Sequence, residues 1–213
     1  METHLIEQKS DAWFDARLGR VTASRVADVI AKTKTGFSTS RSNYMAQLVC
    51  ERLTKTRTES FTNAAMEHGV TQEPFARAAY EAAQGVMVEE VGFVRHPTIE
   101  WAGASPDGLV GGEGEGLVEI KCPNTLTMIE TLLSQKVPGK YFTQMQFQLA
   151  CTGRKWCDYV VFDPRMPAKA QLFVKRVDRD DAYIAEIEAE IVKFLAEVQS
   201  QVNQLNQYIE SKP

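Results

Sequence analysis

The sequence lacks long apolar runs, paired cysteines and any strong excess of one charge. Its longest uncharged apolar run falls far short of the ~20 residues that a membrane-spanning helix requires, so no membrane span is expected. The N-terminal stretch METHLIEQKSDAW has neither a basic nor an apolar segment, and no signal peptide is expected there. Four scattered cysteines form no CxxC pair, which argues against a zinc ribbon or an iron–sulfur cluster. They indicate a reduced, cytoplasmic protein whose cysteines are packing residues.

What is present is the composition of an ordinary globular protein. The 213 residues are 44% hydrophobic and 24% charged, which predicts one domain over residues 1–213 that is large enough to bury a core. The net charge of -4 is uneven: residues 1–60 carry +3, 61–120 carry -8, 121–180 carry +5 and 181–213 carry -4. Two interpretations remain open, namely ordinary variation of surface charge, or a carboxylate site for cations bordered by surfaces for a polyanion.

The period of the apolar residues changes along the chain from that of helices to that of strands. Helices are predicted over 11–18, from a cap at Thr22 or Ser24 to residue 31, over 44–53 and over 62–83, with a polar loop at 32–42. Pro74 should kink the fourth helix or split it in two. Strands are predicted at 86–94, 101–110, 117–122, 156–162 and 172–177, and helices at 126–135, 139–151 and 180–209, the last capped by Asp180. This order predicts an α/β or α+β domain with a mixed central sheet flanked by helices.

One segment, SPDGLVGGEGEGLVEIKC, has the residue types of a metal site. Asp107 stands at a turn, and Glu119 and Lys121 lie two apart on a strand, so both side chains point to the same face. A hairpin can bring Asp107 beside them. Two carboxylates at one place repel each other unless a cation lies between them, and Mg²⁺ is commonly held by one or two carboxylates. Lys121 would then face a water molecule or a scissile phosphate.

The same triplet has a simpler interpretation, because D…ExK occurs by chance and Glu119–Lys121 can be a solvated pair on a strand. Two features of the flanking sequence favour a site. Glu119 and Lys121 interrupt the apolar run formed by Leu117, Val118, Ile120 and Cys122, and SPDG stands directly before the hairpin.

Six ordered motifs extend the pattern over residues 12–166. They are AWFDARLGRVTAS (12–24), HGVTQEPFAR (68–77), GASPDGL (103–109), LVEIKCP (117–123), YFTQMQFQLACTG (141–153) and FDPRM (162–166). Together they resemble the lambda exonuclease and YqaJ-type viral recombinase family of the PD-(D/E)xK nuclease superfamily. The resemblance implies a restriction-endonuclease-like fold, with N-terminal helices over 11–55, a catalytic core over 61–178 and a C-terminal helix over 180–209.

The resemblance also implies roles for individual residues. Asp107, Glu119, the backbone carbonyl of Ile120 and Glu73 would hold two catalytic Mg²⁺ ions, with Mn²⁺ as a possible substitute. Lys121 would be the catalytic lysine, and Gln144 would help to place the lysine or the water. Considered without the family, Glu73 is an exposed helix residue beside a proline. Gln144 and Gln146 are then polar positions on an amphipathic helix, which is the favoured interpretation for Gln146.

A second group of residues resembles the family's pocket for a 5′-terminal phosphate. It consists of Arg17, Ser24 and Ser105, whose guanidinium and hydroxyl groups suit phosphate oxygens. Ser24 can instead cap a helix and Arg17 can lie on an exposed face. Trp13 is either a stacking surface for a base or a core anchor of its helix. His68 and Val70 differ from the aromatic and basic residues that flank the glycine in lambda exonuclease, which puts a phosphate contact there in doubt.

The final predicted helix carries one continuous apolar stripe. Its members are Ile184, Ile187, Ile191, Phe194, Val198, Val202, Leu205 and Ile209. The stripe can pack on the core of the domain or lie partly at a subunit interface. The resemblance implies a ring-shaped homotrimer threaded by DNA.

The expected function is a Mg²⁺-dependent 5′-to-3′ exonuclease on linear double-stranded DNA. It would release 5′-mononucleotides and leave 3′ overhangs for a single-strand annealing protein, in the cytoplasm of a bacterial host and encoded by a phage or prophage. Two alternatives remain open. One is another endonuclease of the superfamily, restriction-type or junction-resolving, and the other is a DNA-end-binding ring without catalysis.

Overall fold

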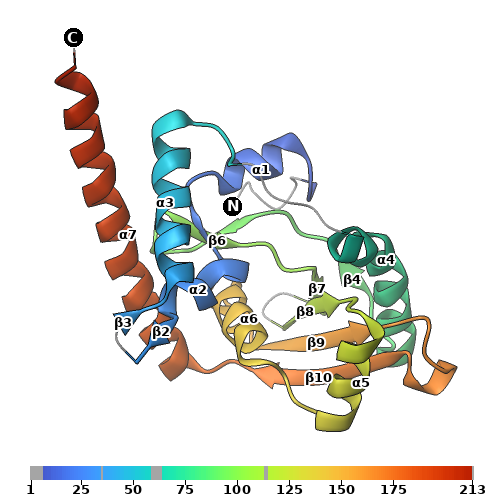
Figure 1. Ribbon diagram of the computed structural model, residues 1–213. Coiled ribbons are helices and arrows are strands. Elements are labelled where there is room, and N and C mark those ends of the chain that lie inside the picture. The colour runs from blue at the N-terminus through green and yellow to red at the C-terminus, as the bar shows by residue number, and fades with distance from the viewer. Residues whose placement is uncertain (1–6, 35, 59–63, 113–114, 213) are drawn as a thin grey trace.

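The computed structural model describes residues 7–34, 36–58, 64–112 and 115–212 (Figure 1). Its α-helices are α1 Asp11–Arg17, α2 Val26–Ile30, α3 Thr39–Thr54, α4 Ala64–Gln84, α5 Thr125–Ser134, α6 Gly139–Thr152 and α7 Asp181–Glu210. Two short 3-10 helices are η2 Ala23–Arg25 and η3 Ala168–Ala170. The strands are β1 Val21–Thr22, β2 Lys32–Thr33, β3 Gly36–Phe37, β4 Val88–Glu89, β5 Val94–Arg95, β6 Ala102–Ala104, β7 Gly108–Val110, β8 Gly116–Lys121, β9 Trp156–Phe162 and β10 Leu172–Asp178.

The central sheet is mixed, as the sequence predicts. Its strand order is β10-β9-β8-β7-β4, with β8 and β9 parallel and the other neighbours antiparallel. Because parallel neighbours need a crossover, α5 and α6 connect β8 to β9. A smaller sheet has the order β1-β6-β5 and lies beside α1 and α2 (Figure 1).

Alternation along β8 distributes its side chains between two apolar clusters. Val118 and Ile120 pack with Ala76 and Tyr80 of α4. Leu117, on the opposite face, belongs to the cluster that contains α6 and α7. Since side chains of a strand alternate, the faces of β8 are fixed by this burial, and the odd-numbered residues turn toward α6.

Two local expectations about the N-terminal half are wrong. Neither Thr22 nor Ser24 caps α2, because Thr22 precedes η2 and makes no capping bond with its side chain. The segment 32–42 is not a loop: it forms the β2–β3 hairpin, after which Ser38 accepts a hydrogen bond from Arg41 N and starts α3 at residue 39.

Pro74 does not split its helix, because α4 runs unbroken from Ala64 to Gln84. Its buried residues pack on the central sheet, and this packing outweighs the lost backbone bond. The single strand expected over 86–94 is also wrong. Val88–Glu89 pairs with β7 in the central sheet, whereas Val94–Arg95 pairs with β6 in the smaller one.

The stripe of α7 is core along most of its length. Six of its eight predicted members are buried, namely Ile184, Ile187, Ile191, Phe194, Val198 and Val202. Arg41 of α3 donates two 2.8 Å hydrogen bonds to Glu197, which ties the two helices together. Leu205 and Ile209 are exposed, and the end of α7 projects beyond the rest of the molecule (Figure 1). Across the described ranges, no helix has the length and apolar character to cross a membrane.

The cysteines fit the packing interpretation except for one. Cys151 and Cys157 are buried and Cys122 is half-buried, but Cys50 is exposed on α3. Burial raises the pKa of the Cys151 and Cys157 thiols well above the usual value, so both are inert packing groups. The expectation is wrong for Cys50.

Candidate active site

The turn before β7 places Asp107 against β8. Asp107 Oδ2 accepts a 2.6 Å hydrogen bond from the backbone N–H of Ile120. The next residue, Gly108, lies against β4, where a Cβ atom would lie 2.1 Å from Val88 Cγ1. The glycine of SPDG therefore lets β4 pack closely on β7 beside this turn. The hydrogen bond to Ile120 brings Asp107 to the ExK strand, as the sequence predicts.

Glu119 is fully buried and both of its carboxylate oxygens are engaged. Lys121 Nζ forms an ion pair with Oε1, and Gln144 Nε2 donates to the same oxygen at 2.6 Å. Gln148 Nε2 donates to Oε2, also at 2.6 Å. The predicted pair on one strand face is thus a buried, hydrogen-bonded network rather than a solvated pair.

Gln148 is a site residue that the sequence reading missed. It follows Gln144 by four residues, so both project from the same face of α6 toward Glu119. Gln146 faces elsewhere: its Nε2 donates to the carbonyl of Asp178 and its Oε1 accepts from the N–H of Asp180. The spacing of four was the available signal, and the favoured interpretation of Gln146 as a polar position outside the site agrees with these contacts.

Burial and neighbouring charges shift the pKa values of the site. Burial raises the pKa of Asp107 to about 8, and the charges of Glu119 and Glu73 act in the same direction. Burial opposes the ammonium of Lys121, but Glu119 and Asp107 outweigh it and raise the pKa of Lys121. Burial and the neighbouring carboxylates therefore favour the protonated form of Asp107 at neutral pH.

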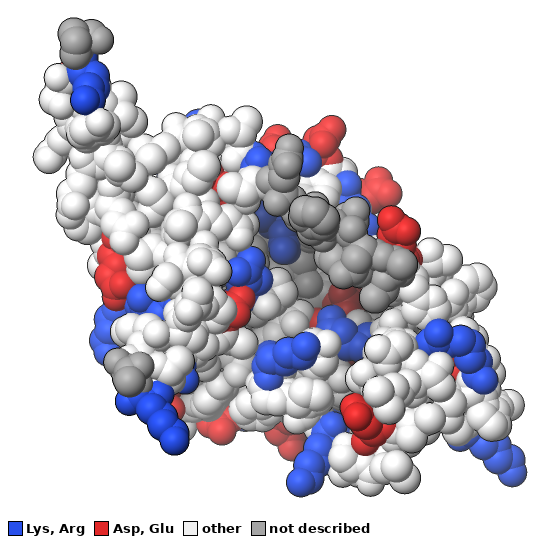
Figure 2. Space-filling model, in the orientation of Figure 1, with Lys and Arg blue, Asp and Glu red and all other residues white. Residues whose placement is uncertain are grey.

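Glu73 approaches this cluster from α4 but pairs with basic residues. Its two oxygens lie 3.3 Å from Lys9 Nζ and 3.4 Å from an Arg77 nitrogen. Within the described ranges, no three Asp, Glu, His or Cys side chains are arranged to hold a metal ion. Figure 2 shows basic side chains around the hollow in this face of the molecule.

The donors nevertheless fit a hard divalent cation. Mg²⁺ is usually held by one or two carboxylates, with water and substrate phosphate as further ligands, so Asp107 and Glu119 are enough. The raised pKa of Asp107 shows that its negative charge is unfavourable where it lies. A cation between the carboxylates would remove that cost.

Three of the four residues predicted to bind a terminal phosphate or a base are in contact. Trp13 Nε1 donates to Ser105 Oγ at 3.0 Å, and Arg17 donates to the same oxygen at 2.9 Å. The Arg17 guanidinium lies 4.0 Å from the centre of the Trp13 ring. Burial lowers the pKa of Arg17 to about 10, so the guanidinium remains charged at neutral pH.

The other residues considered for this pocket do not all join the contact between Arg17 and Ser105. Ser24 is exposed, and among the described residues no hydrogen bond joins it to Arg17 or Ser105; its contact is with Thr22 Oγ1 at 3.5 Å. Trp13 is not a core anchor, because α1 has no buried residue. His68 and Val70 lie in α4.

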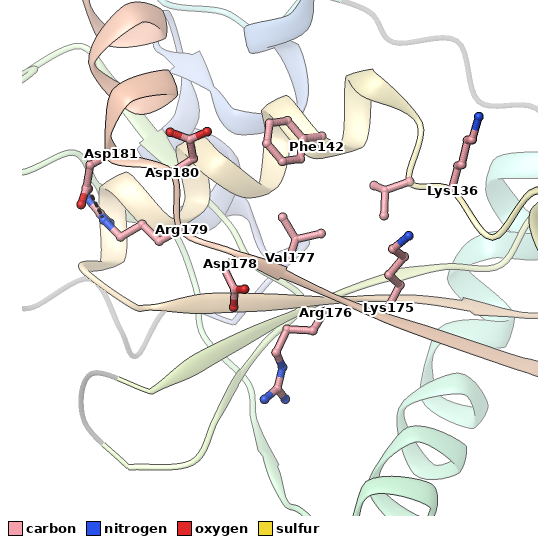
Figure 3. A pocket seen from close by; sticks show the side chains of 10 residues that line it. Lys136, Phe142, Lys175, Arg176, Val177, Asp178, Arg179, Asp180 and Asp181 are labelled. Atoms are coloured by element: carbon pink, nitrogen blue, oxygen red, sulfur yellow. Dashed lines mark hydrogen bonds and ion pairs between the residues drawn. The ribbon is translucent and has the colours of Figure 1, made fainter.

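A cavity of about 670 Å³ lies elsewhere, between β10, α6 and the start of α7 (Figure 3). Lys136, Phe142, Lys175 and Asp178 are among its lining residues, and it contains none of the predicted site residues. The candidate active site therefore lies at Asp107 and Glu119 and not in this cavity.

A mixed sheet that carries two adjacent carboxylates and a lysine, beside a contact between an arginine and a serine, fits the class of nucleases. The chain belongs to the YqaJ-like viral recombinase domain family, whose model matches residues 12–155. This confirms the resemblance seen in the sequence. The FDPRM segment and α7 lie outside the matched range.

Solved structures of two known proteins are similar to this chain. The chain is 53% identical to an alkaline exonuclease, LHK-Exo, from Laribacter hongkongensis, covering 94% of this chain and 98% of that one with a TM-score of 0.88. LHK-Exo has also been solved in complex with dAMP, with the same figures. A phage-related exonuclease from Haemophilus somnus has the same fold at 13% identity, with a TM-score of 0.64 over 89% of this chain and 96% of that one. No curated protein matches the sequence.

Proposed function

We propose that the protein is a Mg²⁺-dependent 5′-to-3′ exonuclease that acts on linear double-stranded DNA, releases 5′-mononucleotides and leaves 3′ overhangs. The observation that carries this proposal is the position of the arginine–serine pocket beside the acidic cluster. Ser105 and Asp107 are two residues apart, a separation of at most about 7 Å along the backbone. A 5′-terminal phosphate at Ser105 would therefore place the next phosphodiester bond near Asp107.

The relatives support the same reaction. The Laribacter protein is an alkaline exonuclease and was solved with dAMP, a deoxynucleoside monophosphate of the kind that stepwise DNA digestion releases. A phosphate pocket next to the cleavage site limits each step to the end of a strand. This restriction favours an exonuclease over an enzyme that cuts within a strand.

The site residues would have two kinds of role, namely binding the metal ions and orienting the reacting groups. Asp107, Glu119, the Ile120 carbonyl and Glu73 would hold the metal ions. When bound, the metal ions supply an activated water and stabilise the leaving 3′ oxygen. Mn²⁺ suits the same oxygen ligands.

The remaining site residues would orient the substrate and the catalytic lysine. Gln144 and Gln148 fix the carboxylate of Glu119, which holds Lys121 so that its ammonium can stabilise charge on the phosphate. Arg17 and Ser105, joined by Ser24 on DNA binding, would hold the terminal phosphate. Trp13 would offer its ring to a terminal base.

The assay that tests the function uses three DNAs, each with Mg²⁺ or with EDTA: linear duplex with 5′ phosphates, the same duplex with 5′ hydroxyls, and closed circular plasmid. We expect Mg²⁺-dependent loss of the phosphorylated linear DNA, slower loss of the hydroxyl-ended DNA and an intact circle. A cut circle would replace the proposal with an endonuclease of the same superfamily. Metal-independent binding without cleavage would replace it with a non-catalytic end-binding ring.

We also propose that the chain forms a homotrimeric ring around DNA, in a bacterial cytoplasm, and passes its 3′ strand to an annealing protein. Two exposed apolar groups lie far apart on the molecule (Figure 1). They are Leu126, Ile129 and Leu133 on α5, and Leu205, Tyr208 and Ile209 at the end of α7. Head-to-tail contacts join two different surfaces of each copy, and they form a ring when the rotation between neighbouring copies closes.

Light scattering tests the ring directly. We expect a particle with three times the 23.9 kDa mass of one chain. The double variant Leu205→Ser/Ile209→Ser should shift the protein toward monomer, since both side chains are exposed and their removal costs the fold little. Replacing Val192, an exposed residue midway along α7, provides the control. A monomeric wild-type protein would contradict the proposal.

A further inference from the structure

The residues that precede α1 lie against the wall of the candidate site. Gln8 Nε2 donates to the carbonyls of Val91 and Pro106, at 2.7 and 2.8 Å. Pro106 directly precedes Asp107, so Gln8 fixes this segment to the turn that carries the carboxylate. On the other side, Ser10 donates from its hydroxyl to the carbonyl of Glu7 and accepts from the N–H of Trp13.

Lys9, between these two anchored residues, has a backbone conformation that is unfavourable for its residue type. Its φ of 69° lies in the left-handed region, which costs free energy in any residue with a side chain other than glycine's hydrogen. Such a conformation persists only where the surroundings enforce it. Here the bonds of Gln8 and Ser10 enforce it, and the result is that the Lys9 ammonium lies 3.3 Å from Glu73 Oε2.

The partner of Lys9 is the one predicted metal ligand that stands apart from the cluster. Glu73 is close enough for its charge to act on Asp107, yet its oxygens contact Lys9 and Arg77. The Lys9 and Glu73 side chains are 49% and 22% exposed, and ion pairs in that range are weak and exchangeable. A divalent cation at Asp107 would attract Glu73 more strongly than one half-exposed ammonium does.

We propose that Lys9 is, beside Arg77, an internal counter-ion of Glu73 that a divalent cation must displace, so that Lys9 lowers the affinity of the site for the metal. This inference rests on the metal site of the proposed function. Lys9 touches neither substrate nor reacting atoms in this role, and it acts through Glu73. The effect should therefore be measurable as metal affinity, without DNA or turnover.

The test is Mn²⁺ binding to the whole chain without DNA, by titration calorimetry or by electron paramagnetic resonance of free Mn²⁺. Lys9→Met should tighten binding by about three- to tenfold, because it removes the competing charge. The matched control is Lys140→Met. Lys140 lies 4.7 Å from the Tyr141 ring, and Lys121 lies 5.3 Å from the same ring. The Lys140→Met substitution thus removes one positive charge near the site without removing a contact to Glu73.

A double-mutant cycle separates displacement from general charge effects. Glu73→Gln should weaken Mn²⁺ binding, and Lys9→Met should have no effect in the Glu73→Gln background. Unchanged affinity in Lys9→Met, an equal gain in Lys140→Met, or a gain that persists without Glu73 would each overturn the inference while leaving the proposed metal site intact. Absence of Mn²⁺ binding in the wild-type chain would overturn both.

Discussion

Lys121→Met should lower the rate of DNA cleavage by about 10²- to 10³-fold, the usual cost of removing one preorganised group that stabilises developing charge. The side chain is 27% exposed, and methionine retains its apolar stem, so the fold should survive. The physical reason for the loss is specific. Glu119 and Asp107 hold the ammonium in its charged form, and no other lysine pairs with Glu119 among the described residues.

Glu119→Gln should have an effect at least as large on the same rate. The substituted amide has one oxygen, whereas the carboxylate accepts from Gln144 and Gln148 on separate oxygens and also pairs with Lys121. One glutamine donor would face an N–H₂ group, and the lysine would lose its partner. A ligand for the metal would be weakened at the same time.

Initial rates on 5′-phosphorylated linear duplex measure both losses, with circular dichroism to confirm folding. Glu130→Gln, on the exposed side of α5, removes the same charge away from the network and should cleave as the wild type does. A folded Lys121→Met or Glu119→Gln protein that cleaves at the wild-type rate would show that the site lies elsewhere.

The central site was predictable because its signals are local in the sequence. Two charged residues inside an apolar strand and a Pro-Asp-Gly turn one hairpin away determine which side chains meet, through strand alternation and turn geometry. The termini of the later helices follow from equally local chemistry, since Asn124 and Asp180 each accept a hydrogen bond from a backbone N–H at the start of their helices.

The wrong predictions concern segments whose structure is determined by residues far away in the sequence. Residues 86–94 look like one strand because apolar residues recur through them, but strand pairing is settled by β7 and β6, which lie later in the sequence. Pro74 predicts a kink or a split, and the split is wrong because tertiary packing of α4 on the sheet keeps the helix continuous. The spacing of four places Gln148 on the same helix face as Gln144, but only the fold shows that Glu119 lies opposite that face.

Charge placement shows the same division between local and distant information. The acidic block over 61–120 and the basic blocks beside it were consistent with ordinary surface variation. In the structure, the charges of Glu73 and Glu119 act on Asp107, while Lys9 and Arg77 pair with Glu73 and Lys121 pairs with Glu119. The sequence shows that opposite charges are available, and only the fold shows that they meet.

Arg17→Ala should remove the preference for 5′-phosphorylated ends, slowing their digestion by about 10- to 100-fold while hydroxyl ends change little. This range corresponds to the ~1.5–3 kcal/mol of a hydrogen bond to a charged group. Arg17 is a half-buried guanidinium whose contacts are Ser105 Oγ and the faces of Trp13 and Phe93. In the part of the chain that the structure describes, it has no ion pair with a carboxylate, and burial lowers its pKa to about 10.

A half-buried guanidinium without a carboxylate partner gains most from binding an anion, and a terminal phosphate is such an anion. The measurement is the ratio of initial rates on phosphate and hydroxyl ends, with Mn²⁺ affinity followed in parallel and expected to stay unchanged. Arg57→Ala is the control, because Arg57 also contacts α1 but pairs with Asp11 and Asp15. Equal loss on both kinds of end would mean that Arg17 supports the fold of α1 or contacts DNA without reading its terminus.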